Sequence, residues 1–230
     1  MGWLRLMKMD EYQLKARFFP CVLAMVSLIV YVIPLIDIDL NNLWKLPALG
    51  VVWAAVGFFV QGVCRNISKY LFQFPLFKED ETNMPTTRML LYKTTLLSRQ
   101  SLDNIVKDIR DDLHLRIDPQ DESEENRKVI AEAVRSIRGR YYNNKLLKGY
   151  NIDFGFIRNL MGGVIFSTII LIFVHICVTM FYCQSMGNMA AISFGVNAVL
   201  FLIAWCTWMS TGRSYARQLF SIYQGDKKNG

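Results

Sequence analysis

The sequence predicts an all-α membrane protein with four transmembrane helices, arranged as two pairs, and a cytoplasmic helical insert between spans two and three. The first observation behind this prediction is composition, because 53% of the 230 residues are hydrophobic. The second is segregation, because four stretches of at least 19 residues contain no Asp, Glu, Lys or Arg. About 20 apolar residues cross the hydrocarbon core of a bilayer, and in lipid such segments satisfy their backbone groups by forming helices.

The four apolar stretches divide the chain into five parts. The stretches are Phe18–Ile36, Leu46–Cys64, Leu160–Tyr182 and Met189–Met209. The expected organisation is an N-terminal interfacial helix over 1–17, a transmembrane hairpin over 18–64, a cytoplasmic helical domain over 65–158, a second hairpin over 159–209 and a cytoplasmic tail over 210–230.

The positive charges predict the topology. Of the 26 Lys and Arg residues, 25 fall before span one, between spans two and three, or after span four, and only Lys45 falls on the other side. Short basic flanks are retained in the cytoplasm. We therefore expect a multi-pass protein of the inner (plasma) membrane with both termini in the cytoplasm. The net charge of +7 follows from this topology and gives no reason to expect recognition of duplex DNA.

The insert is expected to be a small helical bundle. Apolar spacing predicts helices over Thr86–Ser98, from Ser101 until Asp118-Pro119 breaks the pattern, and from near Asp121 or Ser123 to about Asn144. On the last of these, one face carries a basic stripe formed by Lys128, Arg135, Arg138, Tyr142 and Lys145. This stripe is either a solvated face that meets lipid headgroups or acidic partners, or a binding site for a nucleotide or oligonucleotide. Arginine binds phosphate with two parallel hydrogen bonds, and tyrosine stacks on bases.

Polar and small residues inside the spans form two faces at helical spacing. The second span carries Gly50, Ala54, Gly57 and Gln61, and the third carries Thr168, His175 and Thr179. Small residues let helices approach closely in lipid, and an ionisable residue within a span is a functional candidate. Each face is therefore either a pore lining or a helix-packing surface, and His175 either serves function or hydrogen-bonds to a neighbouring helix.

The chain reaches the third span through Gly155, Phe156, Arg158 and Asn159. This segment is either an interfacial belt at headgroup level or a coupling elbow that transmits movement of the insert to the third span. With two spans on each side of a charged helical insert, this segment resembles the small membrane effectors of bacterial anti-phage defence, such as the Hailong-type channel effectors. That resemblance implies a homo-oligomer, with a tetramer favoured, regulated by a nucleotide-derived ligand.

The first functional hypothesis is therefore an oligomeric membrane channel regulated through its cytoplasmic domain. The alternative is a non-conducting membrane anchor or scaffold that binds a cytoplasmic protein partner. We do not expect an enzyme, because the sequence has no paired carboxylates near a span and no phosphate-binding glycine loop. The five cysteines and two histidines form no metal-ligand spacing, so neither a metal nor another cofactor is expected.

Overall fold

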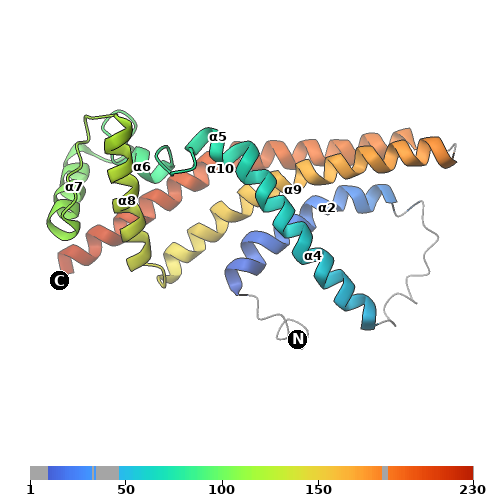
Figure 1. Cartoon of the computed structure of the whole chain (residues 1–230), viewed down its shortest axis with the longest axis horizontal. Coiled ribbons are helices and arrows are strands. Elements are labelled where there is room, and N and C mark those ends of the chain that lie inside the picture. Colours follow the sequence, from blue (N-terminus) through green and yellow to red (C-terminus); the bar gives the residue numbers. More distant parts are fainter. Residues whose placement is uncertain (1–9, 33, 35–46, 183–185, 230) are drawn as a thin grey trace. The chain divides into compact units, whose positions relative to one another are not determined.

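The chain is helical wherever it forms regular structure in the part that the structure describes. This computed structural model describes residues 10–32, 34, 47–182 and 186–229, but the side chains of residues 47–55, 182, 228 and 229 lie outside the description. No strand occurs in these residues. The elements, drawn in Figure 1, are η1 (Gln13–Phe18), α2 (Phe19–Val32), α4 (Pro47–Ser68), η3 (Lys69–Gln73), α5 (Phe74–Phe77), α6 (Pro85–Met89), α7 (Arg99–Leu113), α8 (Glu124–Arg140), α9 (Lys145–Tyr182) and α10 (Gly187–Asn229).

Three of the described helical segments are long and apolar enough to cross a membrane. They are Gln13–Val32, Lys145–Phe181 and Gly187–Lys227. The prediction of an all-helical, membrane-associated protein is thereby confirmed at this level. Helix α4 (Pro47–Ser68) covers the stretch predicted as the second span, and its passage through a membrane stays a prediction.

The chain divides into two compact units. The membrane unit comprises Met1–Leu71 and Gly155–Thr207, and the helical unit comprises Phe72–Phe154 and Trp208–Gly230. Two helices, α9 with 38 residues and α10 with 43, continue without a break from one unit into the other. The last 23 residues of the chain thus belong to the helical unit, whereas the sequence analysis placed 210–230 in a separate tail.

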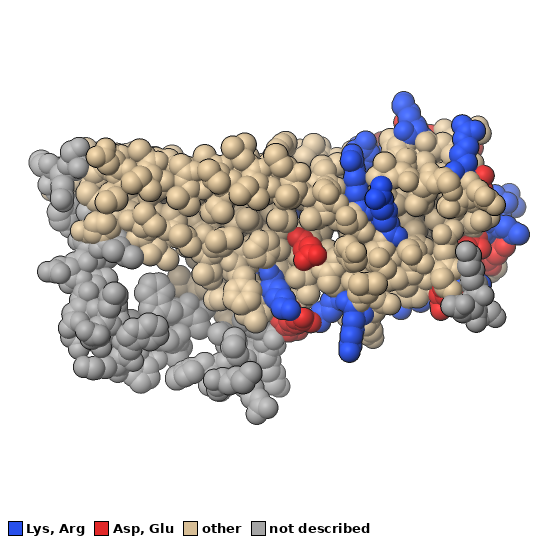
Figure 2. Space-filling view, turned by 180° about the vertical axis from the view of Figure 1, so that it is seen from behind, with Lys and Arg blue, Asp and Glu red and all other residues tan. Residues whose placement is uncertain are grey.

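The membrane unit is held by close approach of backbones. A Cβ at Gly163 would lie 2.8 Å from the Cβ of Ala24, and one at Gly162 would lie 2.8 Å from the Cβ of Ser68. Outward from these contacts the helices present large apolar side chains, such as Phe173, which is 67% exposed. Figure 2 shows a broad face without charged side chains over the apolar helices. Such a surface is what lipid requires.

The helical unit is held by an apolar core. Side chains from α7, α8 and the C-terminal part of α10 meet there, among them Leu102, Ile137 and Phe220. Both central helices begin at a serine cap: Ser98 accepts from the Ser101 N–H, and Ser123 accepts from the Asn126 N–H. Caps of this kind satisfy backbone donors that have no partner within the helix.

Two predictions about the insert need correction. The helix expected over Thr86–Ser98 is only α6, which ends at Met89, because the next residues form turns in which the carbonyl of Leu91 accepts from the N–H groups of Thr94 and Thr95. The buried side chains of Leu90 and Leu91 therefore belong to turns, although their spacing also fits a helix. Helix α7 is capped by Ser98 and starts at Arg99, two residues before the predicted start at Ser101.

Candidate functional site

The basic stripe lies along α8 and the start of α9, within the helical unit. Lys128, Arg135 and Lys145 are exposed, and Tyr142 is 75% exposed. Among the described residues, the structure records no ion pair for these three cations. The stripe therefore presents three cations and an aromatic ring to solvent, a combination that suits phosphate and base contacts.

An acidic loop before α6 lies against one edge of this stripe. Glu81 accepts a hydrogen bond of 3.1 Å from Nη1 of Arg138, which leaves that arginine paired. The pKa of Asp80 is held below its usual value, chiefly by hydrogen bonding from Thr82 and, to a smaller extent, by the charge of Lys128. Acidic residues of the chain itself thus neutralise part of the positive charge that was predicted to bind a ligand.

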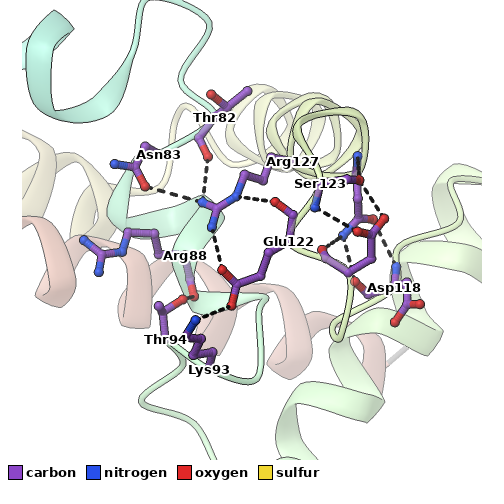
Figure 3. Close-up of polar contacts among 11 residues, drawn as sticks. Thr82, Asn83, Arg88, Lys93, Thr94, Asp118, Glu122, Ser123 and Arg127 are labelled. Carbon is purple, nitrogen blue, oxygen red and sulfur yellow. Dashed lines mark hydrogen bonds and ion pairs between the residues drawn. The ribbon is translucent and has the colours of Figure 1, made fainter.

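Arg127, which the sequence analysis did not single out, fixes this loop. Its Nη1 donates to the carbonyl of Thr82 and to Oδ1 of Asn83, both at 3.4 Å, and its Nη2 lies 3.5 Å from Glu122 (Figure 3). Lys93 pairs with the same glutamate at 3.6 Å. Arg127 lies eleven residues before Arg138, which is about three helical turns, so the two arginines share a face of α8 and both contact this loop.

A hollow of about 810 Å³ lies elsewhere on the helical unit, between α7, the following loop and α8. Its charged lining mixes three cations with four carboxylates, namely Lys107, Arg110, Arg116, Asp103, Asp118, Asp121 and Glu125. The pKa of Asp121 is lowered because Ser123 donates two hydrogen bonds to it. None of the five stripe residues lines this hollow, so the predicted ligand site and the hollow are separate places.

The polar residues of the predicted third span form hydrogen bonds within the chain. The Nδ2 of Asn197 on α10 donates to Thr168 at 2.9 Å, and the hydroxyl of Tyr31 on α2 shares a hydrogen bond of 2.7 Å with Nδ1 of His175. Thr179 is exposed, and its hydroxyl donates to the carbonyl of His175. These contacts support the packing interpretation for Thr168 and His175.

The face predicted on the second span is described only in part. The side chains of Gly50 and Ala54 lie outside the described residues. At Gly57 a Cβ would lie 3.1 Å from the ring of Phe18, so this glycine packs against another segment of the same unit. Gln61 is half-buried. For this face too, the residues that are described point to helix packing.

The predicted coupling elbow lies within the uninterrupted helix α9. A Cβ at Gly155 would lie 3.0 Å from the hydroxyl of Tyr12, and the side-chain amide of Asn159 donates to the carbonyl of Ala16 at 2.6 Å. Arg158 is buried and Phe156 is half-buried. The segment is therefore a tight helix crossing, and its role in transmitting movement stays a prediction.

The end of α10 is bonded to both central helices of the helical unit. The carboxylate of Asp112 on α7 accepts hydrogen bonds from Lys227 at 2.7 Å and from Arg140 on α8. Burial, together with a hydrogen bond of 2.7 Å that Tyr141 donates to Asp226, raises the pKa of Tyr141 to about 12. The apolar spacing of Ala216, Leu219, Phe220 and Tyr223 is the signal that identifies this helix from sequence.

No group of three or more potential metal ligands occurs among the residues whose placement is described. Comparisons with protein-family models, with curated proteins and with solved structures returned no match.

Proposed function

We propose that the chain is a membrane channel formed by several copies and regulated through its helical unit. The observation that carries this proposal is the continuity of α9 and α10, each of which runs unbroken from an apolar segment into the helical unit. At 1.5 Å per residue, α10 is about 65 Å long, roughly twice the hydrocarbon thickness. A displacement of the helical unit would therefore act directly on the spans.

A pore in this proposal forms between copies. Four spans, counting α4, rarely enclose a conduit alone, and the polar residues of α9 described above form hydrogen bonds within the chain. Helix α10 offers a surface for assembly, because Ala191, Gly195 and Ala198 are exposed at spacings of four and three residues. A Cβ at Gly195 would meet nothing within 4 Å. Small residues on a lipid-facing surface suit close contact with another helix, and the resemblance favours a tetramer.

The regulator in this proposal is a nucleotide or oligonucleotide bound at the basic stripe. Arg135 and Lys145 supply phosphate contacts, and the exposed ring of Tyr142 supplies a stacking surface. By analogy with anti-phage effectors, the channel would act in defence at the bacterial inner membrane, with both termini in the cytoplasm. Ligand binding beside the acidic loop would shift the helical unit and, through it, α9 and α10.

Ion flux tests this proposal. The full chain is reconstituted in liposomes and exposed to ATP, to a dinucleotide or to a short oligoadenylate. Ion flux across the liposome membrane is followed with a fluorescent ion indicator. We expect one probe to change the flux, and the double change Arg135→Gln with Lys145→Gln to abolish that response. Arg217→Gln removes an exposed arginine of α10 and serves as the matched control. A flux that ignores every probe, or a response that survives the double change, contradicts the proposal.

The hydrogen bonds of Asn197 and Tyr31 favour a second candidate. Polar groups that bond within the chain suit a non-conducting anchor whose basic stripe binds an acidic cytoplasmic protein. Such an anchor would leave the liposomes intact and would purify with a stoichiometric protein partner. Gly195→Leu separates the two candidates further, because it should break assembly of a channel and leave partner binding by an anchor unchanged.

A further inference from the structure

Three arginines from three different helical segments come together in the membrane unit. Arg17 lies on η1, Arg65 on α4 and Arg158 on α9. Arg158 is 9% exposed, and the other two are half-buried. In sequence each flanks an apolar stretch at its charged end, since Arg17 precedes Phe18, Arg65 follows Cys64 and Arg158 lies two residues before Leu160.

Tight contacts between the three segments fix this arrangement. The hydroxyl of Ser68, three residues after Arg65, donates to the carbonyl of Arg158 at 2.5 Å. The side chain of Asn159 donates to the carbonyl of Ala16, next to Arg17. The arginines are therefore held on backbones that cannot separate without breaking the crossing.

The cluster gathers three positive charges at positions that are partly shielded from water. Arg17 and Arg65 lie within electrostatic range of Arg158, and the guanidinium carbon of Arg17 lies 5.4 Å from the centroid of the uncharged Tyr12 ring. The Nε atoms of Arg17 and Arg65 are buried, and neither has a hydrogen-bond partner among the described residues. Within the same residues, no ion pair is recorded for Arg17 or Arg65.

We propose that this cluster, formed by Arg17, Arg65 and Arg158, binds a phosphate group. Buried charges of one sign need a counter-charge, and guanidinium groups bind phosphate oxygens with paired hydrogen bonds. Arginine is also less strongly hydrated than lysine, so it suits a shielded site. Phosphate reaches this level of the chain from two sources, the headgroup of an anionic phospholipid or a soluble phosphate compound. The proposal does not depend on ion conduction by the chain.

Binding to the purified full chain tests the proposal. Delipidated protein in neutral detergent is mixed with phosphatidylglycerol, with phosphatidylcholine of the same acyl chains, or with inorganic pyrophosphate. Retained molecules are counted by native mass spectrometry. We expect the wild type to retain phosphatidylglycerol or pyrophosphate, and Arg158→Gln and Arg65→Gln to weaken that binding about tenfold or more, as loss of a charge-assisted contact does.

The controls separate a site from general charge attraction. Arg213→Gln removes one positive charge from an exposed position on α10 and should leave binding unchanged. Arg158→Lys keeps the charge without the planar fork and should restore only part of the affinity. Circular dichroism identifies any variant that fails to fold, and Arg65→Gln, at a half-buried position, then decides the question alone.

Each outcome has one meaning. Arginine-dependent retention of phosphatidylglycerol supports the proposal and identifies lipid as the source of the phosphate. Arginine-dependent binding of pyrophosphate without a preference between the lipids supports it with a soluble source. Binding of neither probe, or binding that all variants share with the wild type, overturns it.

Discussion

The two units hold their helices together in opposite ways. In the membrane unit small residues such as Gly162 lie inside, against the backbone of another helix, and large apolar side chains face outward. In the helical unit large apolar side chains such as Leu102 and Ile137 lie inside, and charged residues face outward. The difference follows from the surrounding medium. Burial of apolar surface stabilises a fold in water, whereas in lipid it gives no hydrophobic driving force between helices.

The two units should therefore be sensitive to opposite kinds of substitution. A unit held by apolar volume should lose stability when a large buried side chain is shortened. A unit held by backbone contact should lose stability when a small one is enlarged. Pairs of matched substitutions test both statements in the same chain.

The largest effect is expected from Leu102→Ala. Leu102 is fully buried in the core of the helical unit, and truncation of such a leucine costs about 2–5 kcal/mol of unfolding free energy. Hydrogen exchange in detergent measures the loss for each unit separately. Leu96→Ala, at a position 46% exposed in the same unit, should change little. Equal losses of protection in both units would show that they unfold together and would weaken the comparison.

The sequence predicts the two kinds of packing unequally well. Composition alone identifies the apolar stretches of α2, α9 and α10, because a continuous run of about 20 apolar residues is rare in a folded chain outside a membrane span. The core of α7 and α8 follows from apolar residues such as Ile105 and Ile109 at helical spacing. These are local patterns, and local patterns are what a single sequence carries.

Contacts between distant segments are what the sequence leaves out. Nothing in the spacing around Arg17, Arg65 or Arg158 shows that they meet, because the three positions are separated by 48 and 93 residues. The pairing of Arg138 with Glu81 was hidden for the same reason. The sequence analysis predicts a tail over 210–230 because this part follows an apolar stretch, although Ala216, Leu219 and Tyr223 have helical spacing.

The next largest effect is expected from Gly162→Ala. The added Cβ would overlap the backbone carbonyl oxygen of Cys64 and would lie 2.8 Å from the Cβ of Ser68, so two helices must move apart. Overpacking of this kind costs about 1–3 kcal/mol. Gly62→Ala adds the same methyl group on α4, where the new Cβ would meet no neighbouring segment within 4 Å, and thermal unfolding in detergent compares the two variants. If both variants unfold at the wild-type temperature, close backbone contact does not hold the membrane unit.

A smaller and pH-dependent effect is expected from Asp112→Asn. Lys227 and then Arg140 lower the pKa of Asp112 below its usual value of about 3.9. Because the pKa is lowered in the folded state, the stabilisation is complete above that value and is lost as the pH falls through the folded pKa. The change should cost about 1 kcal/mol at pH 7, and the difference from wild type should narrow below about pH 4.

Unfolding measured in acid and at neutral pH checks this expectation. Asp111→Asn, at the exposed neighbouring position, removes the same charge and is the matched control. The expectation is contradicted if the difference in unfolding free energy between Asp112→Asn and wild type stays constant down to acid pH. The contacts of Asp112 would then stabilise the fold through packing and neutral hydrogen bonds and not through charge. The charged residues on the surface of the helical unit would then contribute little to its unfolding free energy.

The smallest effect is expected from Tyr31→Phe in the membrane unit. Tyr31 is fully buried, and its hydroxyl shares a hydrogen bond of 2.7 Å with His175. Hydrogen bonds between helices in membranes contribute about 0.6 kcal/mol on average, because the separated helices find other partners. The ring itself stays in place and keeps its packing. Tyr142→Phe, at a position 75% exposed, gives the baseline for the same change. If Tyr31→Phe lowers the unfolding free energy as much as Gly162→Ala does, the hydrogen bond to His175 stabilises the membrane unit as much as close backbone packing does. The two units would then not differ in the way described above.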